Sequence, residues 1–478
     1  MQEDRGRSPT LSFLSEEDQN RIHQAVLQIL RQTGMKVLHE EALCLLRSAG
    51  CSVRERNIAL LPKALVEQAL RTAPHEIKIY NRDGSLSMNL GGHRSYFGTG
   101  SDLLYTIDVD TQQRRRCLLD DVRDASRLCD ALPNIDFVMS HAHPSDVAPQ
   151  MAYLSSFQAM AENTRKPIVC TAESRDDLRE MWEIAKIIRN GEKSLRVEPY
   201  FIHYAEPISP LKQAFPGVDK LLFCAEKEIP LVYSPAPISG STAPITVAGH
   251  VAQGLAECLC GMVIHQLKRK GAPFIMGMGP AVLDMVTGEC SYNAPEYYLA
   301  YLAIVQMSHF YDLPSWGYAG TSDSQLPDGQ ATLEAGLMTF LAATAGANLN
   351  HDVGYLDFGR TGSLEMVVIM DEVIDQVRRM LRGIPVKDDT LALDVIHKAG
   401  LGGHFLTEEH TLKHTRTTQW RPTLISREGH DQWQQSGALS LRQRARQKAL
   451  RILRDYTPSL LPIDKVQKIK SHVERFQK

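Results

Sequence analysis

The chain has 478 residues, 43% of them hydrophobic and 23% charged, and its formal net charge is −3 at pH 7. This globular composition excludes a broad basic surface for nucleic acid or an anionic membrane. No run of about 18 apolar residues predicts a membrane span, and the N-terminal MQEDRGRSPTLSFL lacks the apolar core of a signal peptide. Nine cysteines without a CxxC pair favour free thiols. We therefore expect a cytoplasmic protein.

Residues 1–93 predict a helical extension that ends in a hairpin. SEEDQNRIHQAVLQILRQTG begins with Ser15 as a cap and has acidic residues in its first turn, which is typical of a helix start. EEALCLLRSAG and PKALVEQALRTAP predict two shorter helices. IKIYNRDGSLSMNL alternates around Asp83-Gly84, which predicts a β-hairpin.

From residue 94 onward, eight short runs rich in β-forming residues recur at intervals of roughly 30 to 40 residues. They lie near residues 96, 138, 169, 202, 233, 275, 317 and 350, and helical patterns fill the gaps between them. This alternation predicts an α/β fold, a (β/α)8 TIM barrel over residues 94–385. A doubly wound open sheet competes with it, but no GxGxxG follows the first strand. Residues 386–478 predict a C-terminal helical region that packs on the barrel.

The functional residues of such a barrel lie at the C-terminal ends of its strands. The side chains that we select there are aromatic, imidazole or carboxylate groups. They are Tyr96, Phe97, His141, His143, Tyr204, Glu206, His351, Asp352 and Phe358. Strand ends offer no Lys or Arg, and no glycine-rich phosphate loop follows the seventh or eighth strand. Aromatic rings beside carboxylates suit a cation, best a quaternary ammonium, although each ring alone is also explained by packing.

A metal site is the alternative that the residues leave open. His141 and His143 are two apart and share one face of a strand, so they could bind zinc together with Glu206 or Asp352. That set would predict a metal-dependent TIM-barrel hydrolase. Strands five, six and seven contribute no histidine, which weakens this interpretation.

Several long motifs resemble the trimethylamine methyltransferase family, from about residue 10 to about residue 440. They include GTGSDLLYTIDVDTQQRR, YAEPISPL, GTSDSQLPDGQA, AGANLNHDVGYLDFGRTGSLEMVVIMDEVI and HTLKHTRTTQWRPTLISREGHDQW. The resemblance implies a TIM barrel that moves a methyl group from an amine to the Co(I) centre of a separate corrinoid protein. It implies no cofactor bound by this chain. We also expect a homo-oligomer, because barrels of this size commonly associate.

The resemblance also bears on the substrate. Archaeal trimethylamine enzymes of the family carry pyrrolysine, whereas this chain contains only the twenty standard residues. It is therefore similar to members that demethylate quaternary amines, with glycine betaine as the first expectation and proline betaine or carnitine as alternatives.

Loss of a methyl group would turn glycine betaine into dimethylglycine, a tertiary amine. Glu206 is then the expected catalytic residue, facing the ammonium. His351, His141 and His143 are candidate donors to the substrate carboxylate, and Asp352 would orient His351. The aromatic side chains of the selection, Tyr96, Phe97, Tyr204 and Phe358, would line the cage.

Overall fold

The computed structural model describes residues 10–476 and is an α/β protein. Its N-terminal elements are α1 (Glu16–Gln28), the π-helical turn η1 (Ile29–Thr33), β1 (Met35–Val37), α2 (Glu40–Ser48), β2 (Ser52–Arg54), β3 (Ile58–Leu60), α3 (Lys63–Thr72), β4 (Ile77–Tyr80) and β5 (Leu86–Leu90). Ser15 caps α1 through a reciprocal pair of hydrogen bonds with Asp18, which confirms the predicted helix start. β4 and β5 form the predicted hairpin, with Ile77 opposite Leu90.

Eight parallel segments lie at the centre of the molecule. Seven are strands, and the eighth, at residues 137–138, is joined only by single residue pairs. The strands are β6 (Tyr96–Phe97), β9 (Ile168–Cys170), β10 (Phe201–Ala205), β12 (Leu231–Tyr233), β13 (Phe274–Met276), β16 (Trp316–Tyr318) and β17 (Leu349–His351). Each segment pairs with the next one along the chain, and β17 pairs with β6, so the pairings close into a circuit that we call the ring.

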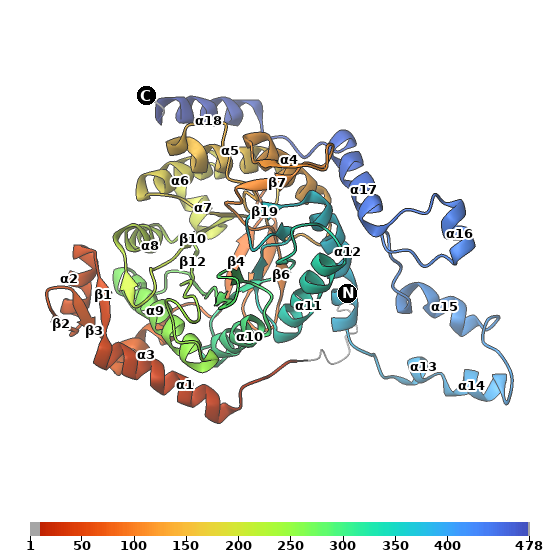
Figure 1. Cartoon of the computed structure of the whole chain (residues 1–478), viewed down its shortest axis with the longest axis horizontal. Coiled ribbons are helices and arrows are strands. Elements are labelled where there is room, and N and C mark those ends of the chain that lie inside the picture. The colour runs from red at the N-terminus through yellow and green to blue at the C-terminus, as the bar shows by residue number, and fades with distance from the viewer. Residues whose placement is uncertain (1–9, 477–478) are drawn as a thin grey trace.

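A helix follows each segment of the ring and covers its outer side (Figure 1). These helices are α4 (Leu119–Ala131), α5 (Ala152–Asn163), α6 (Arg175–Arg189), α8 (Phe215–Lys227), α9 (Val247–Lys268), α10 (Pro295–Phe310), α11 (Gly329–Ala345) and α12 (Leu364–Leu381). Within the described residues, α9 alone is long and apolar enough to cross a membrane, but 78% of its apolar stretch is buried. It packs against α1, α3, α8 and α10, so its apolar side chains form core.

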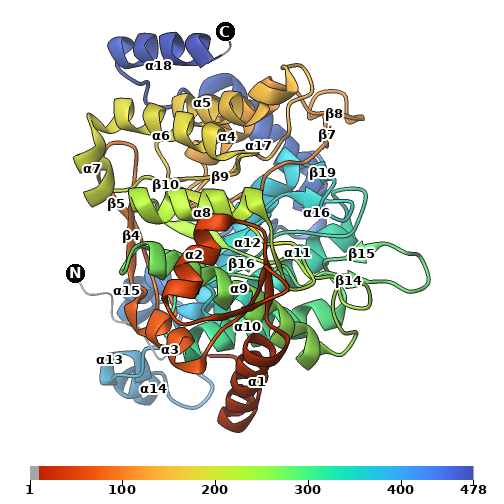
Figure 2. The ribbon, with the colours of Figure 1, turned by 90° about the vertical axis from the view of Figure 1, so that its left-hand side faces the viewer.

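Different elements cover the two ends of the ring, as Figure 2 shows. The β4–β5 hairpin lies at the end where the strands begin, and there the backbone N–H of Asn89 donates to the Tyr96 hydroxyl, 3.1 Å away. The opposite end carries short strands from the connecting segments. They are β7 (Tyr105–Ile107), β8 (Arg114–Arg116), β14 (Val282–Leu283), β15 (Cys290–Ser291), β18 (Tyr355–Leu356) and β19 (Thr361–Gly362).

The described C-terminal residues form six further helices. Four lie in a segment that projects from the ring, and two pack on the helices around it. The six are α13 (Asp388–Leu391), α14 (Leu393–Ala399), α15 (Glu409–Thr418), α16 (His430–Gln435), α17 (Leu441–Asp455) and α18 (Ile463–Phe476). α17 packs on α4 and α12, and α18 packs on α5 and α6. The segment 383–438, which we call the arm, carries α13 to α16 and projects to one side of the ring (Figure 1).

Asn348, directly before β17, holds the point where the ring closes. Its buried amide accepts a hydrogen bond from the Ser315 backbone N–H (2.9 Å) and donates to the carbonyls of Gly92 (3.0 Å) and Arg94 (2.8 Å). This one side chain thereby links three segments, those that precede β16, β17 and β6.

We expect Asn348→Ala to lower the free energy of unfolding by about 2–4 kcal/mol, because it leaves three backbone groups without their partner. Denaturant unfolding checks this, with Asn20→Ala as the control. Asn20 is exposed and makes one hydrogen bond to the Glu16 carbonyl, so its loss should change stability by less than about 0.5 kcal/mol. A loss below about 1 kcal/mol for Asn348→Ala would mean that this junction does not hold the ring.

Candidate active site

Three of the residues at the C-terminal end of the ring have an unusual backbone. Asp102, His141 and Asp352 all have a positive φ, of 66°, 59° and 76°. Side chains other than glycine disfavour this left-handed conformation by roughly 1–2 kcal/mol. The three residues follow β6, the 137–138 segment and β17, which are neighbours in the ring. Clustered backbone strain of this kind is typical of functional sites.

Gly100 explains how two of these loops approach so closely. A Cβ atom at this position would overlap the Asp352 carboxylate and the Tyr355 ring. The loop after β6 therefore passes directly against the loop after β17 only because residue 100 has no side chain. The Tyr355 hydroxyl donates a hydrogen bond to the Ser101 carbonyl and joins the two loops further.

Aromatic rings gather inside the ring at this end. Trp316 and Tyr318 are two residues apart on β16, so they share one face, and Tyr318 lies opposite His351 in the parallel pairing. The His351 ring centroid is 4.1 Å from that of Trp316 and 4.5 Å from that of Tyr318. Tyr204 of β10 reaches across, with its ring centroid 5.7 Å from that of Trp316. We call these four side chains the aromatic cluster.

Both ring nitrogens of His351 already have partners. Nδ1 lies 2.8 Å from the Gly317 carbonyl oxygen, which can only accept, so Nδ1 carries a proton and donates it. Nε2 lies 3.1 Å from Oδ1 of Asp352. Burial lowers the pKa of His351 to about 3 and raises the pKa of Asp352 well above its ordinary value. The neutral ring therefore carries its one proton on Nδ1 and gives it to the Gly317 carbonyl, while Nε2 faces the Asp352 carboxyl group, so His351 has no N–H left for a substrate carboxylate.

Two further carboxyl groups lie at the same end. The Tyr204 hydroxyl donates to Glu206 at 3.3 Å, and the Ser101 hydroxyl donates to Asp102 at 2.9 Å. Burial raises the pKa of both carboxyl groups, although Glu206 is exposed and the Asp102 side chain is 36% exposed. The surrounding protein thus disfavours the ionised form of both groups, even though each of them touches solvent.

Lys220 of α8 supplies the positive charge beside these carboxylates. Its ammonium donates to the Ala172 carbonyl and stabilises the ionised forms of Glu206 and Asp102. Burial lowers the pKa of Lys220 in turn. Sequence reasoning missed this residue because it lies on a helix and not at a strand end. Tyr297 of α10, whose ring is 5.7 Å from that of Tyr318, was missed for the same reason.

His141 and His143, which follow the 137–138 segment, have different surroundings. His141 is buried, and neither of its ring nitrogens has a hydrogen-bond partner among the described residues. Burial lowers its pKa to about 4, and its ring lies 6.3 Å from that of Tyr355. His143 is partly exposed, with Nδ1 4.0 Å from Oδ1 of Asp102 and its ring 5.5 Å from that of Tyr153.

Two of the predicted cage residues, Tyr96 and Phe97, lie away from the aromatic cluster. Tyr96 lies at the opposite end of the ring, against the hairpin. Phe97 is the next residue along the strand and therefore faces outward, where the Arg378 guanidinium of α12 lies 5.6 Å from its ring centroid. The Phe358 ring is covered by the Arg360 guanidinium at 5.2 Å. Tyr204, Glu206, His351 and Asp352 are brought together.

In the described part of the chain, no third His, Cys, Asp or Glu side chain forms a shared metal-ligand group with His141 and His143. Among residues 10–476, only Asp389, His410 and His414 form a group of three or more His, Cys, Asp or Glu side chains close enough to share an ion. This group lies in the arm. Within the described residues, His141 and His143 therefore belong to no such group, and the hydrolase alternative gains no support from the structure.

A solved structure shares the fold of the whole chain. The crystal structure of the hydroxylamine MtmB complex aligns with a TM-score of 0.52 over 97% of this chain and 87% of that one, at 12% sequence identity. The fold and the site thus define an α/β protein with acidic and aromatic side chains gathered at the C-terminal end of its parallel strands.

The chain belongs to the trimethylamine methyltransferase (MTTB) family, whose model matches residues 1–478. It is 32% identical over 465 residues to trimethylamine methyltransferase MttB of Desulfitobacterium hafniense, covering 97% of this chain and 94% of the relative. It is 29% identical over 458 residues to a glycine betaine methyltransferase of the same species, covering 95% and 94%. The two identities are nearly equal, so the choice of amine must be argued from the site.

We expect His351 to remain neutral, with its proton on Nδ1, throughout the range from pH 5 to pH 9. The ring is buried against Trp316, and this burial opposes a second proton more strongly than the hydrogen bond to the Gly317 carbonyl favours one. Nitrogen NMR of histidine-labelled protein, assigned with His351→Gln, measures the tautomer and the pKa. Titration of His351 near pH 6.5 would contradict this assignment.

Proposed function

We propose that this methyltransferase takes a methyl group from a quaternary amine, with glycine betaine foremost, and transfers it to the Co(I) centre of a separate corrinoid protein. The other product is the tertiary amine, here dimethylglycine. One observation carries the choice of a cationic substrate: carboxyl groups with raised pKa values lie beside the aromatic cluster. Proline betaine and carnitine share the charged head group and are the alternative donors.

We further propose that the ring is a (β/α)8 TIM barrel and forms the catalytic domain over residues 94–385. The closed circuit of parallel pairings, with a helical connection after each segment, supports this. Residues 1–93 would be an N-terminal extension and residues 386–478 a C-terminal region. The amine would then enter at the end of the strands where Glu206 and Asp352 lie.

Recognition of the ammonium rests on two kinds of contact. The faces of Trp316, Tyr204 and Tyr318 attract a cation, by about 0.5–2 kcal/mol for each ring in a desolvated site. Glu206 and Asp102 add charge where water solvates it poorly. Together they hold the trimethylammonium group out of water, so that one methyl group points toward the acceptor.

The substrate carboxylate needs hydrogen-bond donors in such a site. His351 was the first candidate, but its two nitrogens are engaged by Gly317 and Asp352. The Lys220 ammonium has three N–H groups and shares one with the Ala172 carbonyl. We assign the carboxylate of a betaine to Lys220, and His351 to the wall of the cage.

The reaction requires little chemistry from the protein. The nucleophile is the cobalt, and a quaternary ammonium that loses a methyl group leaves as a neutral amine without taking up a proton. Burial raises the pKa of cysteine thiols around the ring, for example Cys258 to about 12, which makes them poor nucleophiles. In this account Glu206 keeps its catalytic assignment as the group that faces and positions the ammonium.

Methylation of a Co(I) corrinoid protein tests the proposed function. The purified chain, a cognate corrinoid protein and a panel of amines should show the change in cobalt absorbance with glycine betaine, and little change with trimethylamine. Methylation by trimethylamine alone would assign the protein to tertiary amines. No methylation by any quaternary amine would overturn the proposal.

Lys220→Met should weaken the binding of glycine betaine at least about tenfold and leave the binding of tetramethylammonium within about twofold. The reason is that only the betaine carries a carboxylate for this ammonium. Calorimetric titration measures both affinities. Lys227→Met on the same helix is the control, because Lys227 pairs with Glu226 at 2.9 Å. Equal weakening of both ligands would show that Lys220 acts on the site as a whole.

Binding of a quaternary ammonium should weaken as the pH falls. Burial raises the pKa of Glu206 above its ordinary value of 4.5, so protonation begins at a higher pH and removes the charge that faces the ligand. The ligand favours the ionised form, and affinity is therefore complete above the raised pKa and lost below it. Titrations between pH 5 and pH 9 measure this dependence. The Glu206→Gln variant should bind the ligand weakly, and its affinity should depend little on pH. If the variant keeps the pH dependence of the unaltered protein, Glu206 is not the group that faces the ligand.

A further inference from the structure

The arm has no hydrophobic core of its own. No residue of α13, α14, α15 or α16 is buried, in the part of the chain that the structure describes. Large apolar side chains such as Leu401, Leu406 and Leu412 are exposed instead. Burial of apolar surface is the main stabilising contribution in folding, and small units without it commonly depend on a disulfide, a partner or a bound metal ion. The arm therefore needs another source of order.

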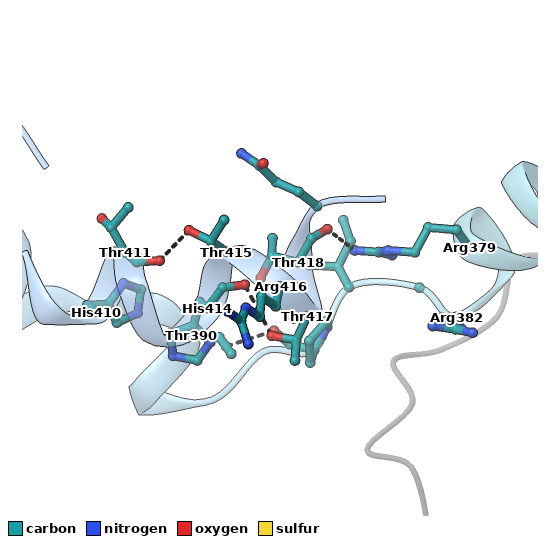
Figure 3. A pocket seen from close by; sticks show the side chains of 14 residues that line it. Arg379, Arg382, Thr390, His410, Thr411, His414, Thr415, Arg416, Thr417 and Thr418 are labelled. Atoms are coloured by element: carbon teal, nitrogen blue, oxygen red, sulfur yellow. Dashed lines mark hydrogen bonds between the residues drawn. The ribbon is translucent and has the colours of Figure 1, made fainter. Parts of the chain in front are cut away.

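A group of possible ligands joins two helices of the arm. Asp389 lies on α13, while His410 and His414 are four residues apart on α15 and thus share one face of that helix. The two imidazole centroids are 4.3 Å apart, and Nε2 of His414 lies 3.2 Å from Oδ2 of Asp389. One possible ligand atom from each residue lies within 4.8 Å of the other two. Figure 3 shows His410 and His414 along the same helix.

We propose that Asp389, His410 and His414 bind one zinc ion, which fastens α13 to α15. Imidazole nitrogen and carboxylate oxygen are ordinary zinc ligands, with bonds of about 2.0–2.2 Å. In a tetrahedral site, two such ligand atoms are roughly 3.3 Å apart. The separation of 3.2 Å between His414 and Asp389 agrees with this geometry.

The orientation of the two histidines supports an ion between them and the carboxylate. Nε2 of His414 is shielded from solvent and makes no well-directed hydrogen bond to any residue within 10–476, although Asp389 is close. Two atoms that point at a shared ion are near each other without being aligned with each other. Nε2 of His410 lies 2.9 Å from the Asp389 backbone carbonyl oxygen, which keeps this imidazole beside the same aspartate.

Nearby cations compete with the ion and shape the rest of the site. The Lys413 ammonium lies 2.9 and 3.0 Å from the two Asp389 oxygens, but its side chain is 61% exposed and can move aside. Arg379, Arg382 and Arg416 line the adjoining pocket of about 940 Å³ (Figure 3). Their charge lowers the affinity for a cation, although solvent screens it, and favours water or a small anion as the fourth ligand.

Zinc titration of the untagged full-length protein, after treatment with a chelator, tests the site. Competition against a chromophoric chelator should give about one zinc ion per chain, and elemental analysis should confirm that stoichiometry after dialysis. His410→Ala and His414→Ala should each weaken binding at least about tenfold. His430→Ala, a change in the same arm but outside the group, should leave it unaltered. Lys413→Met should tighten binding several-fold, because it removes the competing charge.

Proteolysis supplies a second readout that does not depend on activity. Zinc should slow cleavage in the segment 400–408, between α14 and α15, in the unaltered protein and in His430→Ala, and should have no effect in His414→Ala. Substoichiometric zinc in the unaltered protein, or equal affinity in His410→Ala, His414→Ala and the control, would overturn the proposal. The methyltransferase assay is not involved, so this result is independent of the proposed substrate.

Discussion

Burial of carboxyl groups beside aromatic rings is the constraint on which the site depends. An ionised carboxylate loses solvation where protein surrounds it, and the raised pKa values of Asp102, Glu206 and Asp352 reflect that loss. Lys220 is the cation that acts on both Asp102 and Glu206. A bound cation would add positive charge beside these carboxylates and so stabilise their ionised forms. The arrangement therefore suits a cationic ligand.

The fold produces this arrangement through short distances between loops. The parallel pairing places Tyr318 beside His351, and the glycine at position 100 lets two loops meet at Asp352. Left-handed backbone at Asp102 and at Asp352 re-aims those side chains where the strands end. At the opposite end, Asn348 fixes the closure of the ring. The side chain that closes the ring and the carboxyl groups of the candidate site thus lie at opposite ends of the same strands.

Periodicity in the sequence predicts much of this architecture, because strand and helix patterns depend on local residue types. The eight predicted runs correspond to the segments of the ring, although the one near 138 forms only single residue pairs. The direction of a side chain is harder to predict. A shift of one residue moves a side chain to the other face of a strand, and Phe97 therefore faces α12.

Local sequence patterns do not predict which distant segments come into contact. Lys220 and Tyr297 reach the site from helices, so selecting strand ends omitted them. The partners that occupy both nitrogens of His351 come from Gly317 and Asp352, and the first of these is 34 positions earlier in the chain. The role as a carboxylate donor was reasonable for an isolated histidine, but the neighbouring carbonyl removes it.

The central claim is that the site recognises the positive charge of its substrate. Calorimetric titration with glycine betaine and with 3,3-dimethylbutanoate compares two ligands of the same shape and the same carboxylate, of which only the first carries the ammonium charge. This account predicts that glycine betaine binds at least about tenfold more tightly, as cation–π contacts of about 0.5–2 kcal/mol for each ring require. Equal affinity for the two ligands would contradict it.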